Sequence, residues 1–214
     1  MLALSPHELS PLLLQADLGR GAEVFAGMLD DPALAALASL APTARDLAEA
    51  ASHPDPDRFL RRRAISRSLL ARRMECAADG VAIGHDGRGT PFVLDSRRGW
   101  PETFLSVSAR HTLFAIAFAP HRIGIDLEPV GLPAEPPWNV LALAERQALQ
   151  ALPPARQHVA FLEIWTAREA LLKAMGVGFL EAGDAQREPG QRLWRAQAVL
   201  GSTSIVLACV DLPR

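Results

Sequence analysis

The chain has 214 residues, of which 49% are hydrophobic, and its formal net charge is −2. This length and composition allow a substantial core, arranged as one large domain or two small lobes. The slightly acidic balance argues against general attraction to nucleic acid or membranes, so any phosphate-binding surface would have to be local.

The first eighty residues are predicted to be mainly helical. Residues 1–20 are expected to form a short leading helix or a loose extension. Asp followed by Pro, as in Asp31-Pro32 and Asp55-Pro56, is typical of a helix N-cap and first turn. The elements expected after the extension are, in chain order, a strand over 23–29, an alanine-rich helix up to residue 52 that is interrupted at Pro42, and a helix over about 58–76.

After Gly80, short apolar segments separated by Gly, Pro or Asp-Gly predict strands. These strands cover residues 81–83, 92–94, 104–108, 112–119 and 123–127, and the last two are expected to form a hairpin around Pro120-His121. Two helices, over about 138–151 and 155–175, and a hairpin of residues 192–200 and 204–210 complete the chain.

The order of helices, strands, helices and strands predicts an α+β fold of two pseudo-symmetric α+β lobes. We expect an N-terminal lobe of residues 1–119 and a C-terminal lobe of residues 120–214. Cys76 and Cys209 show no disulfide or zinc-ligand spacing, which is typical of a reducing compartment. No signal peptide or span-length apolar segment is recognised, so a cytoplasmic location is expected.

Asp126 and Glu128 lie two residues apart on a predicted strand, so their side chains leave on the same face. The apolar Ile123, Ile125 and Leu127 alternate with them and are expected to point into the core. Paired carboxylates repel unless a cation joins them, and oxygen ligands suit Mg²⁺. The alternative is a strand end that carries solvated acids before a turn.

Lys173 is the only lysine among 22 basic residues, and it follows Glu169 by one helical turn. An ammonium is a compact charge, whereas a guanidinium is a rigid fork, so a single lysine in an arginine-rich chain points to a place that a fork does not fit. Taken alone, the two residues could form an ordinary surface pair. The predicted helix also has a buried apolar stripe that includes Trp165 and Leu172, and Glu169 is expected at its edge.

The helix over about 58–76 carries seven arginines. Such a helix could present a solvated face or bind nucleic acid, although the overall charge of the chain is acidic. Arg63 and Arg67 share a strip with Leu70 and Met74, so these two arginines are expected at the rim of the core, where they could grip a phosphate.

Two motifs together resemble those of the 4′-phosphopantetheinyl transferases, in their larger, two-lobed, monomeric class. The first is Gly124-Ile125-Asp126-Leu127-Glu128; the second is Trp165-Thr166-Ala167-Arg168-Glu169-Ala170-Leu171-Leu172-Lys173 followed by Gly176. The resemblance extends from about residue 58 to 180. It implies two α+β lobes with coenzyme A between them, and transfer of the phosphopantetheine arm to a serine of an acyl or peptidyl carrier protein, with release of adenosine 3′,5′-bisphosphate.

The resemblance also implies roles for individual residues. Asp126, Glu128 and Glu169 would hold Mg²⁺ against the pyrophosphate, Glu169 would help to deprotonate the serine, and Lys173 would stabilise charge on the phosphate under attack. The residues implied in coenzyme A binding are Arg63, Ser108 and Arg110. The partners implied are coenzyme A and the carrier protein, with no nucleic acid or membrane, and a monomer is expected.

Three positions depart from the family pattern. Ala109 replaces a histidine that grips the coenzyme A 3′-phosphate, Thr90 replaces a lysine, and Arg168 replaces the first lysine of the second motif. These changes affect the coenzyme A grip more than the metal site, and they keep open a relative that binds coenzyme A or carrier proteins without transfer.

Overall fold

The computed structural model describes residues 14–19, 21–87, 89–94, 102–131, 138–177 and 190–212. Its strands form two antiparallel sheets, in the orders β1-β2-β6-β5-β4-β3 and β7-β9-β8. The strands are β1 (Leu14–Gly19), β2 (Ala22–Met28), β3 (Ile83–His85), β4 (Pro91–Val93), β5 (Phe104–Arg110), β6 (Leu113–Ala119), β7 (Ile123–Pro129), β8 (Arg192–Leu200) and β9 (Thr203–Asp211). The helices are α1 (Ala35–Ala38), α2 (Ala44–Ala50), α3 (Pro56–Arg73), α4 (Leu143–Gln150) and α5 (Pro154–Met175), with short 3-10 turns at Pro32–Leu34, Ala78–Gly80 and Trp138–Val140.

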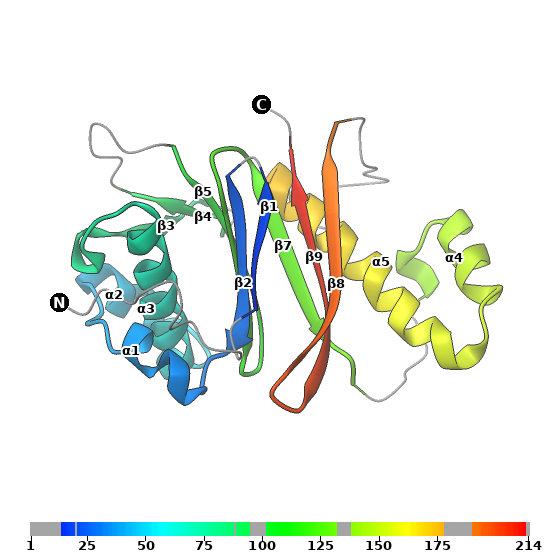
Figure 1. Cartoon of the computed structure of the whole chain (residues 1–214), viewed down its shortest axis with the longest axis horizontal. Coiled ribbons are helices and arrows are strands. Elements are labelled where there is room, and N and C mark those ends of the chain that lie inside the picture. Colours follow the sequence, from blue (N-terminus) through cyan, green and yellow to red (C-terminus); the bar gives the residue numbers. More distant parts are fainter. Residues whose placement is uncertain are drawn as a thin grey trace.

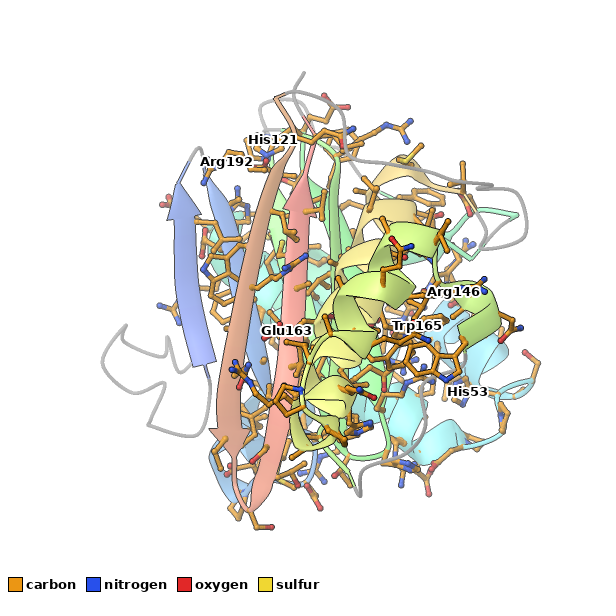
Figure 2. All side chains as sticks on the ribbon, turned by 90° about the vertical axis from the view of Figure 1, so that its right-hand side faces the viewer. His53, His121, Arg146, Glu163, Trp165 and Arg192 are labelled. Carbon is orange, nitrogen blue, oxygen red and sulfur yellow. The ribbon has the colours of Figure 1, made fainter. Side chains whose placement is uncertain are left out.

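The molecule has four layers, helices, sheet, sheet and helices, so the α+β prediction is confirmed (Figure 1). Helices α1 to α3 lie outside the first sheet, and α4 and α5 lie outside the second. Figure 2, turned by a right angle, shows α5, which carries Glu163 and Trp165, running alongside β8 and β9. In the described parts of the chain no helix combines the length and apolarity needed to cross a bilayer.

Strand β6 is buried along its whole length because both of its faces are covered. Phe114, Ile116 and Phe118 point toward the core under α3. The alternate residues are small and face the second sheet, where they meet Ile123, Ile125 and Leu127 of β7. The small side chains on this face are Ala115, Ala117 and Ala119 of β6 and Ala22 and Ala26 of β2. Small residues on one sheet and large ones on the other allow the two sheets to pack closely.

The first sheet contains strands from residues 14–119 and the second contains strands from residues 123–211. This partition has the same chain position as the predicted lobe boundary. The division into two pseudo-symmetric lobes itself stays a prediction.

Two sequence predictions are wrong. Residues 14–19 form an edge strand paired with β2, not part of a helix or loose extension, and Gly19 and Gly21 have φ angles of 75° and 72° in the turn between them. Strands β6 and β7 do not form a hairpin, because β6 pairs with β2 and β5, whereas β7 pairs with β9. The hairpin was predicted because the two strands are adjacent in sequence. In the structure the chain passes into the second sheet at Pro120-His121, and β7 then covers one face of β6 instead of pairing with its edge.

The serines of β5 join the two sheets at the free edge of β7. The Ser106 hydroxyl accepts a hydrogen bond from the Ile125 N–H at 3.1 Å, and the Ser108 hydroxyl accepts one from the Leu127 N–H at 3.3 Å. Buried N–H groups of an edge strand need such partners. The two hydroxyls therefore take the place of a neighbouring strand and fix β7 against β5.

Candidate active site

Gly124 lets α5 approach β7 closely enough to build the site. A Cβ atom at this position would lie 1.9 Å from the Ala170 carbonyl oxygen and 2.5 Å from the Ala174 nitrogen. Only glycine avoids that overlap, since both neighbours are helix backbone. The contact brings Glu169 and Lys173 of α5 beside the acidic face of β7, as the paired motifs predicted.

Asp126 is buried and is the centre of the site. Its Oδ1 accepts hydrogen bonds from Lys173 Nζ at 2.7 Å and from the Ser108 hydroxyl at 2.9 Å. Lys173 also donates to the Ile125 carbonyl oxygen at 3.2 Å. The other carboxylate oxygen, Asp126 Oδ2, is buried and has no hydrogen-bond partner in the described structure. A buried carboxylate oxygen without a partner is energetically unfavourable, which indicates a place for a further ligand.

Glu128 is held by Arg110 of β5. Arg110 contacts Glu128 Oε1 through Nε at 2.9 Å and through a terminal nitrogen at 2.8 Å. The hydrogen bond to Glu128 raises the pKa of Arg110 above its ordinary value. Arg110 is half exposed and leaves β5 on the same side as Ser108, two residues before it, so it reaches the acids and not the side of Ala109.

Glu169 is a partly buried acid with a raised pKa. Burial raises its pKa, and the neighbouring charge of Asp126 raises it further, against the opposing effects of Lys173 and Arg110. A carboxylate with a raised pKa is a stronger base than an ordinary one. The charges that influence Glu169 include both Asp126 and Glu128, so all three predicted acids interact electrostatically.

The three acids do not form a closed metal cage in this arrangement. Among the described residues, no group of three His, Cys, Asp or Glu side chains comes close enough to hold an ion by itself. Mg²⁺ does not require one, because it commonly takes one or two carboxylates and completes its shell with water and phosphate oxygens. The unpartnered Asp126 Oδ2 and the oxygen-only donor set fit such an ion. Joint ligation by Asp126, Glu128 and Glu169 stays a prediction.

Two small hollows, each of about 210 Å³, flank β5. The first, the lysine hollow, is lined by residues that include Lys173, Thr90 and Ser106. The second, the arginine hollow, is lined by Arg62 and Arg63 of α3 together with His85, Ala109 and others. The two hollows share Gly89, Pro91 and Val107 in their linings, so they are neighbours.

Arg63 and Arg67, which the sequence placed together at the rim of the core, are both buried and share Asp46, but their guanidinium groups have different further partners. Arg67 is fully buried. Its guanidinium pairs with Asp46 at 3.0 Å and donates hydrogen bonds to three backbone carbonyl oxygens. The expectation that Arg67 grips a phosphate is therefore wrong, because this side chain braces the loops around α3. Arg63 pairs with Asp46 at 3.2 Å and with Glu49, and it lines the arginine hollow.

Arg168 links α5 to α4. It donates to the Val140 carbonyl oxygen and pairs with Glu145. A planar fork can hold two acceptors at once, which explains an arginine where the family pattern has lysine. The departure is structural and lies outside the acid cluster.

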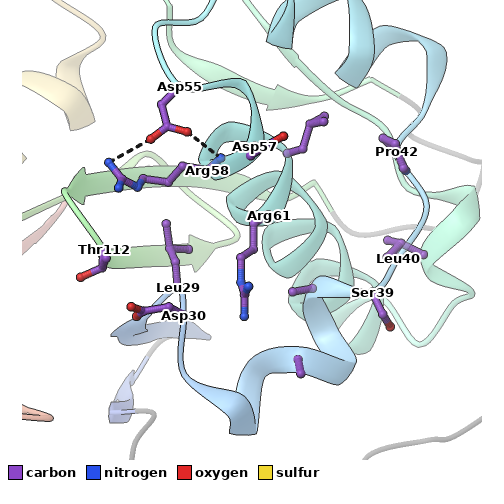
Figure 3. A pocket seen from close by; sticks show the side chains of 13 residues that line it. Leu29, Asp30, Ser39, Leu40, Pro42, Asp55, Asp57, Arg58, Arg61 and Thr112 are labelled. Carbon is purple, nitrogen blue, oxygen red and sulfur yellow. Dashed lines mark hydrogen bonds and ion pairs between the residues drawn. The ribbon is translucent and has the colours of Figure 1, made fainter.

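A larger hollow, of about 660 Å³, lies between α3, α1 and the turn after β2. Figure 3 shows Asp55 and Arg58 paired at its edge and Arg61 pointing into it. None of the predicted site residues is among its described lining residues. Size alone therefore does not mark the active site of this chain.

Sequence reasoning missed Ser106, His85 and Arg62. Ser106 alternates with Ser108 on β5, and this spacing is the signal that could have identified it. His85 belongs to a three-residue strand, and nothing in the sequence connects it with α3. Arg62 was counted among the seven arginines, but its position in the hollow depends on packing.

Comparison with known proteins agrees with this site. Residues 122–199, which contain Asp126, Glu128, Glu169 and Lys173, match the model of the 4′-phosphopantetheinyl transferase superfamily. A candidate 4′-phosphopantetheinyl transferase of Synechocystis sp. is 32% identical over 150 residues, which cover 67% of this chain and 58% of that protein. The 4′-phosphopantetheinyl transferase HetI of Nostoc sp. is 32% identical over 129 residues, which cover 56% of this chain and 52% of that protein.

The chain thus spans rather more than half the length of each of these relatives. The region matched by the family model includes β7 and α5, the two elements that the Gly124 contact brings together. Through this region, the chain belongs to the 4′-phosphopantetheinyl transferase superfamily.

Proposed function

We propose that this protein is a Mg²⁺-dependent 4′-phosphopantetheinyl transferase that acts on an acyl or peptidyl carrier protein with coenzyme A as co-substrate. One arrangement carries the proposal. Lys173 and Glu169 lie close to Asp126, one carboxylate oxygen of which has no hydrogen-bond partner, and Lys173 lines the lysine hollow. All three residues lie within the region matched by the family model. We further propose that the protein works as a cytoplasmic monomer of the two-lobed class.

The reaction forms a bond between the carrier serine oxygen and the phosphorus that bears the pantetheine arm. The bond from that phosphorus to the bridging oxygen of the pyrophosphate breaks, and adenosine 3′,5′-bisphosphate leaves. Phosphoryl transfer of this kind depends mainly on positioning and on cations that neutralise developing charge. A bound Mg²⁺ would supply such neutralisation at the pyrophosphate, with Asp126, Glu128 and Glu169 as its proposed ligands.

The chain's own residues have distinct parts in this proposal. Glu169, whose pKa is raised by burial, accepts the serine proton directly or through a water. Lys173 is held on Asp126 in the lysine hollow and stabilises charge on the phosphate. Arg110 and Ser108 contact the acids from β5, where Arg110 can exchange Glu128 for a phosphate oxygen.

The test is incubation of the purified protein with apo carrier proteins of several pathways, coenzyme A and Mg²⁺, followed by intact-mass measurement. We expect at least one carrier to gain the mass of one phosphopantetheine group in a Mg²⁺-dependent manner. A matched reaction with Glu169→Gln should give no gain. Absence of the product with every carrier, at protein concentrations that bind coenzyme A, would contradict the transferase proposal.

A second candidate is a relative that binds coenzyme A or carrier proteins without transfer. One observation favours it: Lys173 and Arg110 already pair with Asp126 and Glu128, so the acids are partly neutralised without a metal ion. The same experiment separates the two candidates, since this relative would bind coenzyme A and leave every carrier unmodified.

A further inference from the structure

Arg110 is bound to the acid cluster at a single atom. Two of its guanidinium nitrogens lie on Glu128 Oε1, at 2.9 and 2.8 Å. Within the described parts of the chain, Glu128 is its only hydrogen-bond or ion-pair partner. Lys173, the other cation of the cluster, has two acceptors on β7, one from Asp126 and one from the Ile125 carbonyl group. Arg110 can therefore be released at one oxygen, whereas Lys173 is held at two.

The two partners of this ion pair differ in their exposure to solvent. The side chain of Arg110 is 54% exposed, whereas that of Glu128 is 14% exposed. An exposed arginine stays hydrated when it turns away from its partner, so its release costs little free energy. A mostly buried carboxylate, in contrast, is destabilised when it loses its counter-ion. Glu128 therefore needs a cation beside it, but that cation does not have to be Arg110.

Arg110 also changes the charge that a metal ion would meet in the acid cluster. The charges of Asp126 and Glu169 act on Arg110 in addition to that of its partner Glu128. When these three acids are ionised, Lys173 and Arg110 balance two of the three negative charges. Without Arg110 only one of them is balanced. A divalent cation is therefore attracted more strongly when Arg110 has left the cluster.

We infer that Arg110 competes with the divalent cation for Glu128 and leaves this carboxylate when the ion binds. The inference rests on the proposed function in one respect, because it takes the acid cluster as the site of the ion. The ion pair with Arg110 neutralises Glu128 and thereby lowers the affinity of the cluster for the ion. By reciprocity, a bound ion weakens the pair and frees the guanidinium, which is then available to a phosphate oxygen.

The test is calorimetric titration of the full chain with Mg²⁺ or Mn²⁺, in the absence of coenzyme A and carrier protein. We expect Arg110→Gln to bind either ion at least about 5-fold more tightly than the wild type, as for a modest coupling between two ligands. Arg110→Lys keeps the positive charge and should bind the ion less tightly than Arg110→Gln. Arg195→Gln removes the same charge from an exposed position on β8 and should leave the affinity unchanged.

A double-mutant cycle with Glu128→Gln shows whether Arg110 acts through that acid. Removal of Arg110 in the Glu128→Gln background should raise the metal affinity much less than it does in the wild type. An equal increase in both backgrounds would overturn competition for Glu128. Binding by Arg110→Gln that is equal to or weaker than that of the wild type, or no measurable binding by either, would overturn the inference as a whole.

Release of the guanidinium can be followed directly in the NMR spectrum of the chain with isotope-labelled arginine. The Nε–H signal of Arg110 is assigned by its loss in Arg110→Lys. We expect this signal to shift when Mg²⁺ saturates the site, because its hydrogen bond to Glu128 breaks. A signal that does not move at saturating Mg²⁺ would show that Arg110 stays on Glu128 and would overturn the displacement.

These measurements separate the inference from the transferase proposal, because they need no carrier protein. If Arg110→Gln binds the ion more tightly but the chain modifies no carrier, the inference holds and the transferase proposal fails. If the chain modifies carriers in a Mg²⁺-dependent manner while both forms bind the ion equally well, the reverse is true. Damage to the fold would weaken binding, so a gain in affinity has another cause, and thermal melting of each variant checks this.

Discussion

Lys173 makes contacts that an arginine cannot reproduce in the same space. Its ammonium touches Asp126 Oδ1 and the Ile125 carbonyl oxygen, from a side chain that is about one-third exposed. A guanidinium is wider and planar, so its charge would be displaced from the phosphate. We expect Lys173→Arg to lower kcat/KM for transfer by about 10²-fold or more, the usual effect of removing one transition-state donor. Arg156→Lys, the reverse exchange at an exposed position on the same helix, should leave kcat/KM unchanged. Equal turnover in Lys173→Arg would show that the single lysine has no catalytic meaning.

Glu169 combines partial burial with proximity to two other acids. Replacing its carboxylate by an amide removes a base and one negative charge from a group of like charges. We therefore expect Glu169→Gln to reduce kcat by about 10²- to 10⁴-fold, the range for general base catalysis. The melting temperature should stay the same or rise, because repulsion with Asp126 is relieved. A variant that unfolds more readily would instead indicate a structural role for Glu169.

The contact between Gly124 and the α5 backbone sets the distance between β7 and α5. A methyl group at this position would overlap helix backbone at 1.9 Å, which a side-chain rotation cannot relieve. We expect Gly124→Ala to reduce the free energy of unfolding by at least about 1–3 kcal/mol, the cost of overpacking a core. Transfer activity should fall as well, because α5 carries Glu169 and Lys173. Gly131→Ala is the matched control, since a Cβ atom there has no neighbour within 4 Å. Equal urea midpoints for the two variants would contradict the close approach.

The elements could be predicted from sequence where the pattern is local. The alternation of Ile123, Ile125 and Leu127 with Asp126 and Glu128 determines the two faces of β7, and the structure confirms it, with the apolar side chains against the first sheet. Strand pairing is less local. Strand β1 was missed because it is defined by its pairing with β2, and the β6–β7 hairpin was wrong because strand order depends on partners far along the chain.

The candidate site shows the same limit. Placement of Glu169 and Lys173 beside Asp126 could be anticipated from paired motifs, because each motif lies on one element. The arginine hollow could not, because Arg62 and His85 come from α3 and β3, and only their packing brings them together. Arg67 lies on the same strip of α3 as Arg63, so the sequence predicted the same role for both. In the structure, however, its guanidinium donates its hydrogen bonds to backbone carbonyl oxygens and to Asp46.

At the scale of the whole molecule, the two sheets are held together by apolar packing and by the serines of β5. Further contacts join the sheets at one end, where Arg192 donates to the Leu18 carbonyl oxygen and His121 lies 3.4 Å from Asp211 (Figure 2). The active-site residues are divided between the sheets, since Ser108 and Arg110 lie on β5 and the metal-binding acids proposed above lie on β7 and α5. The geometry of the site therefore depends on how the two sheets pack against each other.

A substitution at Ser106 tests whether the site depends on the contact between the sheets, because Ser106 does not contact the acids. Its hydroxyl accepts a hydrogen bond from the buried Ile125 N–H, and the Ile125 carbonyl oxygen accepts one from Lys173. Ser106→Ala leaves this N–H unpaired, so we expect the free energy of unfolding to fall by about 1–3 kcal/mol. Hydrogen exchange should accelerate over residues 123–127, and transfer should weaken because β7 can shift relative to β5. Ser39→Ala, which removes an exposed hydroxyl bonded to the Ala36 carbonyl, should change none of these measurements. Faster exchange over β7 with unchanged activity would show that the serine joint stabilises the sheets but does not position the catalytic groups.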